Sequence, residues 1–254
     1  MIQTIEELSM NAWPAAQTVL SGGWVLRFSG GYTRRANCVT ALYSTRQDSD
    51  AFHADPSYVS AKIHACETLY RAQGLPVVFK LPGKQESAEL DRLLGDEGYT
   101  AEAETSVQIL DLGQWKDAET PEITLEYSAG ETWHADFSRL SGLAEKNHAA
   151  HRQIVGSILT QTCFARVTAN DQVTACGLGV IQDSYLGIFD IVTGTEFRRQ
   201  GYGEQIMCDL LGWAQRQGAH TAYLQVMLNN PPALALYAKL GFQEAYQYWY
   251  RVKR

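Results

Sequence analysis

Features that mark several protein classes are missing from this sequence of 254 residues. No apolar run approaches the roughly 18 residues of a membrane-spanning helix, and Lys and Arg form no cluster of the kind that binds a phosphate backbone. The first ten residues carry Glu6 and Glu7, where a signal peptide needs basic residues and an apolar core. We therefore expect a cytoplasmic protein that binds neither a membrane nor nucleic acid.

Cysteine is scarce, and its spacing is uninformative. The five cysteines are odd in number, widely spaced and free of any CxxC pair: Cys38, Cys66, Cys163, Cys176 and Cys208. This pattern predicts neither a disulfide framework nor a zinc site, so we expect reduced, mostly buried thiols and no bound metal.

The composition is that of an ordinary globular protein, with 45% hydrophobic and 19% charged residues. The length exceeds the usual size of one domain, which favours two. The polar stretch Asp111 to Glu122 interrupts the apolar patterning, so we predict domains at residues 1–118 and 119–254. The net charge of −7 mildly favours cationic partners such as amines.

Apolar periodicity predicts alternating strands and helices in both halves. In the first half we expect strands at Trp24 to Phe28, Val39 to Tyr43, Val77 to Leu81 and Val107 to Leu110, with helices at Tyr58 to Gln73 and Ser87 to Asp96. In the second we expect strands at Ile123 to Tyr127, Cys163 to Thr168, Val173 to Gln182, Tyr185 to Thr193, Ala222 to Val226 and Tyr246 to Val252, with helices at Thr132 to Leu143, His151 to Leu159, Gly203 to Gln217 and Pro232 to Leu240. The halves end alike, with Gln-Gly after a helix and then a strand, a short helix and Gly-Tyr or Gly-Phe, which indicates an internal repeat.

The strongest local signal is RRQGYG, Arg198 to Gly203, which follows a predicted strand and opens a helix. Unpaired N–H groups and the positive end of the dipole make a helix N-terminus an anion site. Gly201 and Gly203 would let a pyrophosphate approach the backbone. The Lys-Ser/Thr ending of a Walker loop and the third glycine of a Rossmann loop are both missing.

A second pattern follows some 30 residues later, NxxAxxLYxxxGF, carried by Asn230, Ala233, Leu236, Tyr237, Gly241 and Phe242. With the RxxGxG loop, it resembles the GNAT superfamily of acyl-CoA-dependent N-acyltransferases over about residues 122–254. Residues 1–118 resemble a degenerate copy of the same fold, because no such loop precedes Tyr58 and Leu94 stands where Tyr237 stands in the second half.

The resemblance implies an α/β (α+β) chain of two GNAT-like domains, each a twisted, mixed, mostly antiparallel sheet flanked by helices. It implies acetyl-CoA as cosubstrate, with its arm between the strands ending at Thr193 and Val226. The residues implied to bind it are Ile191, Val192, Thr193, Arg198, Arg199, Gln200, Gly201, Tyr202, Gly203 and Asn230.

The implied reaction is direct attack of an amine on the acetyl thioester. The ordinary pKa of an alkylamine is about 10, so the amine is almost entirely protonated at pH 7. Some group must therefore accept a proton before or during the attack. Our candidate base is Asp190, a carboxylate inside the apolar segment IFDIV, although it could instead cap a turn or pair with an arginine. Glu196 is the second candidate. By the resemblance, Tyr237 would protonate the departing thiolate, although it could also be a core aromatic.

Other residues have a functional and a structural interpretation. His148 and His151 could share a helix face and bind metal, but a third ligand is missing. Tyr246, Tyr248 and Tyr250 could line an acceptor pocket or pack against a helix. In the segment Gly22 to Asn37, the side chains of Arg27, Arg34, Arg35 or Asn37 could reach an acceptor carboxylate or lie in a solvated turn.

Three functions remain open. The first is acetyl transfer to a primary amine of a small molecule, the second is acetyl transfer to a protein or peptide, and the third is regulation by acetyl-CoA binding without catalysis. The sequence does not determine the oligomeric state, and a homodimer is compatible with it.

Overall fold

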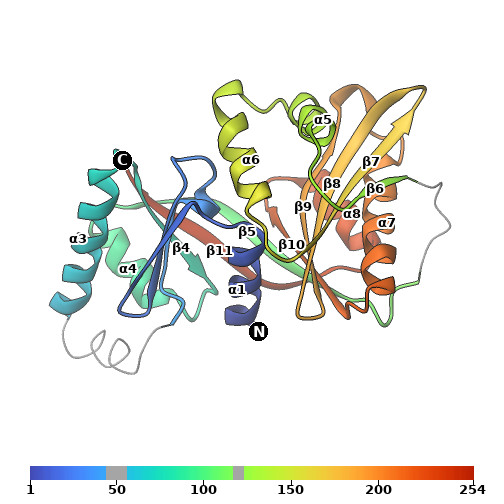
Figure 1. Cartoon of the computed structure of the whole chain (residues 1–254). Helices are drawn as coiled ribbons and strands as arrows, with labels where there is room; N and C mark the ends of the chain where they lie inside the picture. Colours follow the sequence, from blue (N-terminus) through green and yellow to red (C-terminus); the bar gives the residue numbers. More distant parts are fainter. Residues whose placement is uncertain (44–55, 117–122) are drawn as a thin grey trace. The chain divides into compact units, whose positions relative to one another are not determined.

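The computed structural model describes residues 1–43, 56–116 and 123–254 (Figure 1). Its first half contains α1 (Ile2–Ala12), β1 (Gln17–Ser21), β2 (Trp24–Phe28), β3 (Val39–Thr40), α3 (Pro56–Ala72), β4 (Val77–Pro82), α4 (Ala88–Asp96) and β5 (Thr100–Asp111). The second half contains β6 (Thr124–Glu126), α5 (Glu131–Ser141), α6 (His148–Gly156), β7 (Gln161–Ala169), β8 (Gln172–Gln182), β9 (Tyr185–Thr193), α7 (Tyr202–Arg216), β10 (Thr221–Met227), α8 (Pro231–Lys239) and β11 (Gln243–Lys253). Short 3₁₀ turns lie at Arg34–Ala36, Glu145–Asn147 and Thr195–Phe197.

The strands form one mixed sheet of 11 strands, in the order β1-β2-β3-β4-β11-β5-β10-β9-β8-β7-β6. We expected two separate sheets, and this part of the fold prediction was wrong. The reason lies in β5 and β11, which are 12 and 11 residues long and occupy the middle of the sheet. At about 3.3 Å per residue, each is long enough to serve both halves.

The chain nevertheless divides into two compact units, and neither is continuous in sequence. Unit 1 is Met1–Ser106, Met227–Asn229 and Tyr246–Arg254, and unit 2 is Val107–Val226 and Asn230–Ala245. The predicted boundary segment includes residues 117–122, which lie outside the described residues.

Unit 1 has its own apolar core, in which α3 packs on the sheet. Fully buried side chains from both elements meet there, among them Ile63 and Tyr70 of α3 and Phe79 of β4. Helix α1 adds a buried ion pair, since Lys80 Nζ lies 2.6 Å from Glu6 Oε2 and the Tyr246 hydroxyl donates to Glu6 Oε1 at 2.8 Å. The sequence did not predict this helix; Glu6, which argued against a signal peptide, is a buried partner of Lys80.

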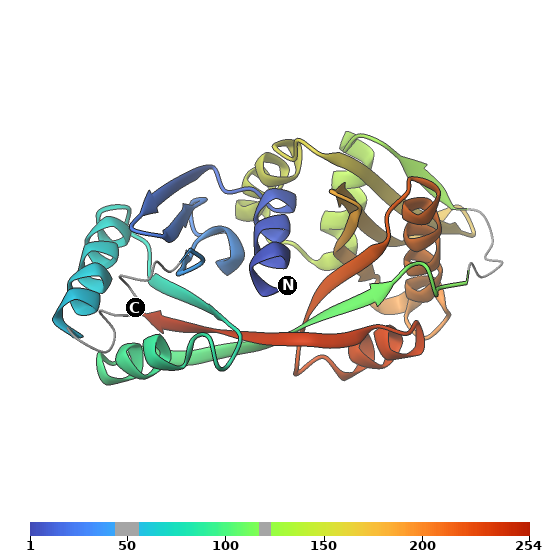
Figure 2. The ribbon, with the colours of Figure 1, turned by 90° about the horizontal axis from the view of Figure 1, so that it is seen from below.

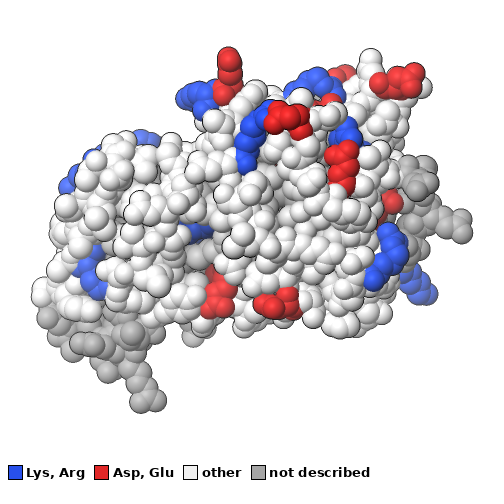
Figure 3. Space-filling view, viewed as in Figure 1, with Lys and Arg blue, Asp and Glu red and all other residues white. Residues whose placement is uncertain are grey.

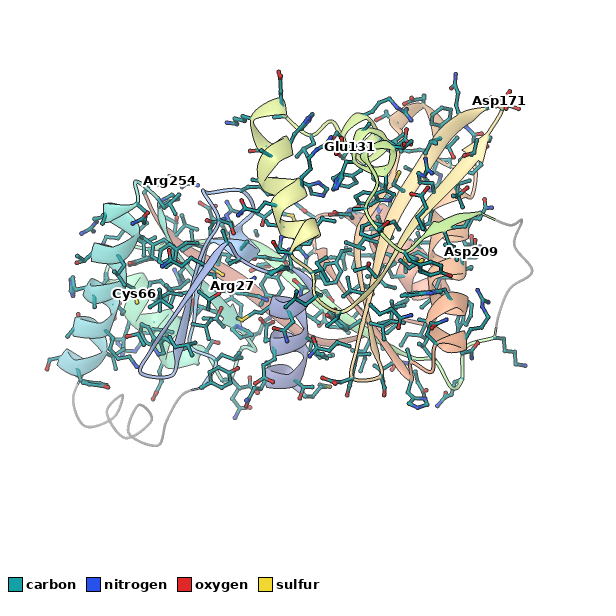
Figure 4. All side chains as sticks on the ribbon, in the orientation of Figure 1. Arg27, Cys66, Glu131, Asp171, Asp209 and Arg254 are labelled. Atoms are coloured by element: carbon teal, nitrogen blue, oxygen red, sulfur yellow. The ribbon has the colours of Figure 1, made fainter. Side chains whose placement is uncertain are left out.

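Two polar side chains of the basic segment Gly22 to Asn37 make contacts that stabilise the fold of unit 1. Arg27, labelled in Figure 4, is 3% exposed and donates to the backbone carbonyls of Met10, Trp13 and Arg35. Asn37 accepts from two backbone N–H groups and donates to two carbonyls. These two side chains therefore hold the turn and have few donors to offer a ligand.

Asp91 of α4 ties that helix to β11 in unit 1. Its carboxylate accepts from Arg251 at 2.8 and 2.9 Å and from Trp249 Nε1 at 2.6 Å, and hydrogen bonding by Arg251 lowers the pKa of Asp91. The ionised form is favoured in the folded state, so its stabilisation is present above the unfolded pKa of about 3.9 and is lost as the pH falls through the folded value.

We expect Asp91→Asn to lower the free energy of unfolding by about 1.5 to 3 kcal/mol at pH 7. The deficit should shrink below about pH 4, because the carboxyl of the unfolded wild type then takes up a proton while the folded carboxylate, with its lowered pKa, stays ionised. Urea unfolding at pH 7 and pH 3.5 measures both. The control is Asp96→Asn on the same helix, because the Arg92–Asp96 pair is exposed and worth less than about 1 kcal/mol. Equal losses from the two variants would contradict this account.

In unit 2, helices cover both faces of the strands β7 to β9, and alternate residues along a strand point to opposite faces. Along β7, Cys163 and Ala165 belong to the core under α7, whereas Phe164 between them packs against Trp133 of α5 at 5.0 Å between ring centroids. Figures 1 and 2 show α7 and α5 on opposite sides of these strands. Tyr185–Thr193 has the predicted bounds, and β7 and β8 form the predicted hairpin.

The five cysteines are buried and unbridged, as expected. Among the described residues, no helix is long and apolar enough to cross a membrane. On the face drawn in Figure 3, basic and acidic side chains are interspersed. Among the described residues, charged side chains form several pairs of opposite sign, such as Arg139 with Asp136 at 3.2 Å.

Candidate active site

Strand β9 carries a β-bulge near its end. Cys176 pairs with Val192 and Leu178 with Phe189, so Asp190 and Ile191 together oppose the single residue Gly177. Asp190 has a φ of 52°, in the left-handed region that Asp tolerates better than most residues. Bulges of this kind redirect a side chain and recur beside active sites.

Gly177 is what makes room for the bulge. A Cβ atom there would lie 2.6 Å from Ile206 Cγ2 and 2.7 Å from Ile191 Cδ1, closer than real Cβ contacts. Any larger residue at position 177 would therefore push Ile191 or α7 away from the strand.

The bulge decides which face Asp190 uses. In a regular strand Ile188 and Asp190 would point the same way. Instead Ile188 and Ile191 both pack in the core under α7, and Asp190 turns to α6, where its Oδ2 lies 2.9 Å from His151 Nε2. The bulge thus keeps the carboxylate out of a dry core.

His151 is held in an aromatic setting. It is 1% exposed and stacks on Phe137 with ring centroids 4.6 Å apart, while His134 meets it edge-on at 5.6 Å. Burial, and then the charge of His151, lower the pKa of His134. His148, which the sequence grouped with His151, instead contacts the Leu143 carbonyl at 3.0 Å. No cluster of three metal-ligating side chains exists among the described residues.

The loop after β9 leads into the N-terminus of α7. Gly201 is the N-cap residue, with a φ of 89°, and Arg199 before it has a φ of 65°. A Cβ atom on Gly201 would meet nothing within 4 Å, so open space faces the backbone there. The first N–H groups of α7 are available to an anion, and the helix dipole adds to the attraction.

Helix α8 forms the other side. Asn230 caps it, because its Oδ1 accepts from the Ala233 N–H at 3.4 Å, and prolines occupy the first two positions. Tyr237 is 8% exposed, and burial raises the pKa of its phenol to about 12. The phenol therefore keeps its proton at neutral pH.

These elements enclose a groove of about 730 Å³, entirely within unit 2. Its wall includes every predicted site residue except Asp190 and Gln200: Ile191, Val192, Thr193, Arg198, Arg199, Gly201, Tyr202, Gly203, Asn230 and Tyr237. Gln200 is exposed and donates to the Glu196 carbonyl at 3.4 Å. Residues that sequence reasoning did not include are Phe197, Glu204, Pro232, Ala233, Ala235, Leu236 and Lys239.

The groove begins where two parallel strands part. β9 and β10 pair from Tyr185 with Thr221 to Ile188 with Leu224. Residues Ile191 to Thr193 lie beyond this pairing and line the groove. Their backbone groups on that side are positioned as an edge that an extended ligand could pair with.

Comparison with known proteins identifies the family. Residues 1–251 match the family model described as "Probable histone acetyltransferase Rv0428c C-terminal". The chain belongs to this family. It is a GNAT N-acetyltransferase, and membership of the GNAT superfamily implies acetyl-CoA as the acetyl donor.

Two relatives and one solved structure show what this GNAT chain is similar to. YobR of Bacillus subtilis, described as an uncharacterized N-acetyltransferase, is 30% identical over 257 residues, which are 100% of this chain and 99% of that protein. The [ribosomal protein bS18]-alanine N-acetyltransferase of Salmonella typhimurium is 31% identical over 80 residues, 32% of this chain and 54% of its own. A tandem GNAT protein from the clavulanic acid biosynthesis pathway has a similar fold, with a TM-score of 0.70, 14% identity, and coverage of 98% of this chain and 87% of that one.

Proposed function

We propose that the groove of unit 2 binds acetyl-CoA, which supplies an acetyl group activated as a thioester. The observation that carries this is the N-terminus of α7, opened by Gly201 and flanked by Arg198 and Arg199, in the wall of a groove of about 730 Å³. The N–H groups of residues 199–203 hold the pyrophosphate. Ile191 to Thr193 pair with the arm, and Asn230 contacts it through its amide N–H groups, since its Oδ1 already caps α8.

Two side chains carry the proton transfers. Asp190 accepts a proton from the bound ammonium and passes it to solvent, which leaves a neutral amine to attack the acetyl carbon. As the C–N bond forms and the C–S bond breaks, Tyr237 donates its proton to the leaving sulfur. The second proton lost by the nitrogen restores Tyr237, so one proton is released for each acetyl group transferred. Burial supports this role for Tyr237, because it keeps the phenol protonated until charge develops on sulfur.

We propose a primary amine of a small molecule as the acceptor. The chain's net charge of −7 and the carboxylate of Asp190 both favour a cationic substrate. The alternative is an amine on a protein, which the family description and the Salmonella relative support. That relative matches only 32% of this chain, so its acceptor is a hypothesis for this protein. The third alternative is a regulator that binds acetyl-CoA without transferring the acetyl group.

We propose that residues 119–254 form the catalytic domain and that residues 1–118 do not bind acetyl-CoA. Every residue of the groove wall falls between Ile191 and Lys239. In the first half, Leu94 is buried at the position that Tyr237 occupies in the repeat.

The test is release of coenzyme A thiol from acetyl-CoA with a panel of free primary amines and, separately, peptides that offer an N-terminal alanine or an internal lysine. We expect turnover on at least one class of free amine that exceeds turnover on every peptide. Faster reaction with peptides would favour the protein acceptor. Tight acetyl-CoA binding in calorimetry with no transfer to either panel would favour the regulator.

A further inference from the structure

Asp190 meets its only described side-chain partner through one of its two carboxylate oxygens. Among residues 1–43, 56–116 and 123–254, His151 is the side chain that hydrogen-bonds Asp190, through Oδ2 at 2.9 Å. Asp190 is 10% exposed and His151 is 1% exposed. The pair is therefore largely buried, and its hydrogen bond to His151 takes up Oδ2 of the carboxylate.

The partner fixes the role of the imidazole. An ionised carboxylate only accepts hydrogen bonds, so Nε2 of His151 must carry a proton and donate it to Oδ2. Stacking on Phe137, with ring centroids 4.6 Å apart, holds the plane of the ring, and the hydrogen bond to Oδ2 favours the ring orientation that directs Nε2 at Asp190.

The charged and titratable groups around the pair come from four elements. Strand β9 contributes Asp190, β8 contributes Cys176, α5 contributes His134 and Glu131, and α6 contributes Arg152 beside His151. Glu131 and Arg152 are paired with each other at the surface. His134 meets His151 edge-on, and its Nδ1 is buried without a hydrogen-bond partner among the described residues. Asp190 is accordingly the anion in contact with His151.

A carboxylate on a bulge needs such a partner. The terminal torsion of Asp is broad, so the side chain alone does not define where Oδ1 points. Its backbone φ of 52° also costs free energy that surrounding contacts must offset. Proton transfer, in contrast, requires the accepting oxygen within about 3 Å of the ammonium.

We propose that His151 is a positioning residue for acetyl transfer: it holds Oδ2 of Asp190 so that Oδ1 faces the acceptor and takes the proton of a primary ammonium group. This inference rests on the proposed function and specifies the arrangement of its base. His151 contacts neither the acceptor nor acetyl-CoA.

The experiment compares His151→Phe, His151→Gln, Asp190→Asn and their wild type. His151→Phe keeps a flat ring against Phe137 but removes the donor, so kcat should fall by about 10- to 100-fold, the cost of misplacing a reacting group by about 1 Å. His151→Gln returns an N–H donor near the position of Nε2 and should restore most of the rate. Asp190→Asn should lose about 10²- to 10⁴-fold. The matched control is His134→Phe, the same change in the same aromatic cluster, with kcat unchanged.

Two readouts separate positioning from a merely structural role. The acidic limb of kcat/KM against pH should move to higher pH in His151→Phe, because the ionised carboxylate loses a donor, and should stay in place in His134→Phe. In the double variant His151→Phe/Asp190→Asn the rate should fall no further than in Asp190→Asn alone, as expected for residues that act as a unit. Calorimetry should give the same acetyl-CoA affinity for every variant.

The possible results are distinguishable. If His151→Phe keeps the wild-type kcat and acidic limb while Asp190→Asn is slow, the positioning role is overturned and the proposed function stands. If Asp190→Asn is as fast as wild type, the base assignment and this inference both fall. If wild type transfers no acetyl group, the proposed function itself fails. Should His151→Phe not fold, His151→Gln, which keeps an N–H donor, supports the inference if it retains most of the wild-type rate and the wild-type acidic limb, and overturns it if it folds and binds acetyl-CoA but loses the rate.

Discussion

Acetyl-CoA binding should weaken by more than about 100-fold when Gly201 and Gly203 are both replaced by Asp. The two carboxylates would stand at the start of α7, where the pyrophosphate is proposed to lie. A unit charge about 4 Å from a like charge costs about 1 kcal/mol in bulk water and about 4 kcal/mol near a protein surface, and about 1.4 kcal/mol is a tenfold change. Isothermal titration with acetyl-CoA measures the loss.

The structure offers a matched control for this variant. Gly218 has a φ of 83° with open space around it, like Gly201. Gly156 is a helical glycine, like Gly203; a Cβ atom would meet nothing within 4 Å at Gly156 and would make only ordinary contacts, the nearest at 3.4 Å, at Gly203. Neither Gly156 nor Gly218 lines the groove. The Gly156→Asp/Gly218→Asp protein should bind acetyl-CoA as wild type does. If both double variants lose binding, the effect comes from destabilisation and not from the anion site; if neither does, the pyrophosphate lies elsewhere.

The turnover of Tyr237→Phe should fall by about 10²- to 10⁴-fold while the dissociation constant for acetyl-CoA stays unchanged. The substitution removes only the hydroxyl, so packing against Phe242, 6.0 Å away between ring centroids, is kept. The pKa of Tyr237 is raised to about 12 by burial, so its proton is in place at any ordinary assay pH, and the deficit should be the same at pH 7 and pH 9.

Tyr185→Phe is the control for the missing hydroxyl. Tyr185 lies at the opposite end of β9 from the groove and is not part of its wall. Thiol release in single turnovers should be slow for Tyr237→Phe and normal for Tyr185→Phe. A Tyr237→Phe protein with wild-type turnover would mean that solvent protonates the thiolate.

Local patterns predicted much of the fold. Trp24–Phe28 and Tyr185–Thr193 have the expected bounds, because each is an apolar run ended by turn residues. Helix α7 starts within one residue of the prediction, since glycines mark its entrance. The end of β9, the glycine loop and Tyr237 follow in the expected order around one groove.

Long-range pairing escaped prediction. The sequence suggested only Val107 to Leu110 of β5, because the preceding residues, TAEAETS, are polar and small. Their strand character comes from neighbours in the sheet, and tertiary context outweighs β-propensity at such positions. The contact of His151 with Asp190 joins residues 39 apart and depends on a bulge, which no short motif announces.

Strand β11, which belongs partly to each unit, limits which parts of the chain can be lost in evolution. Tyr246–Arg254, the last segment of the chain, belongs to unit 1, and within it Tyr248–Lys253 pairs with Val77–Pro82 of β4. A gene fragment encoding the first half alone would leave β4 with an open edge, and open edges invite aggregation. The first half, to which we assign no acetyl-CoA, contains neither the glycine loop nor a tyrosine at the position of Tyr237, yet deleting it would strip β11 of its partner β4. A half proposed to carry out no chemistry can thus be retained because the second half supplies its final strand.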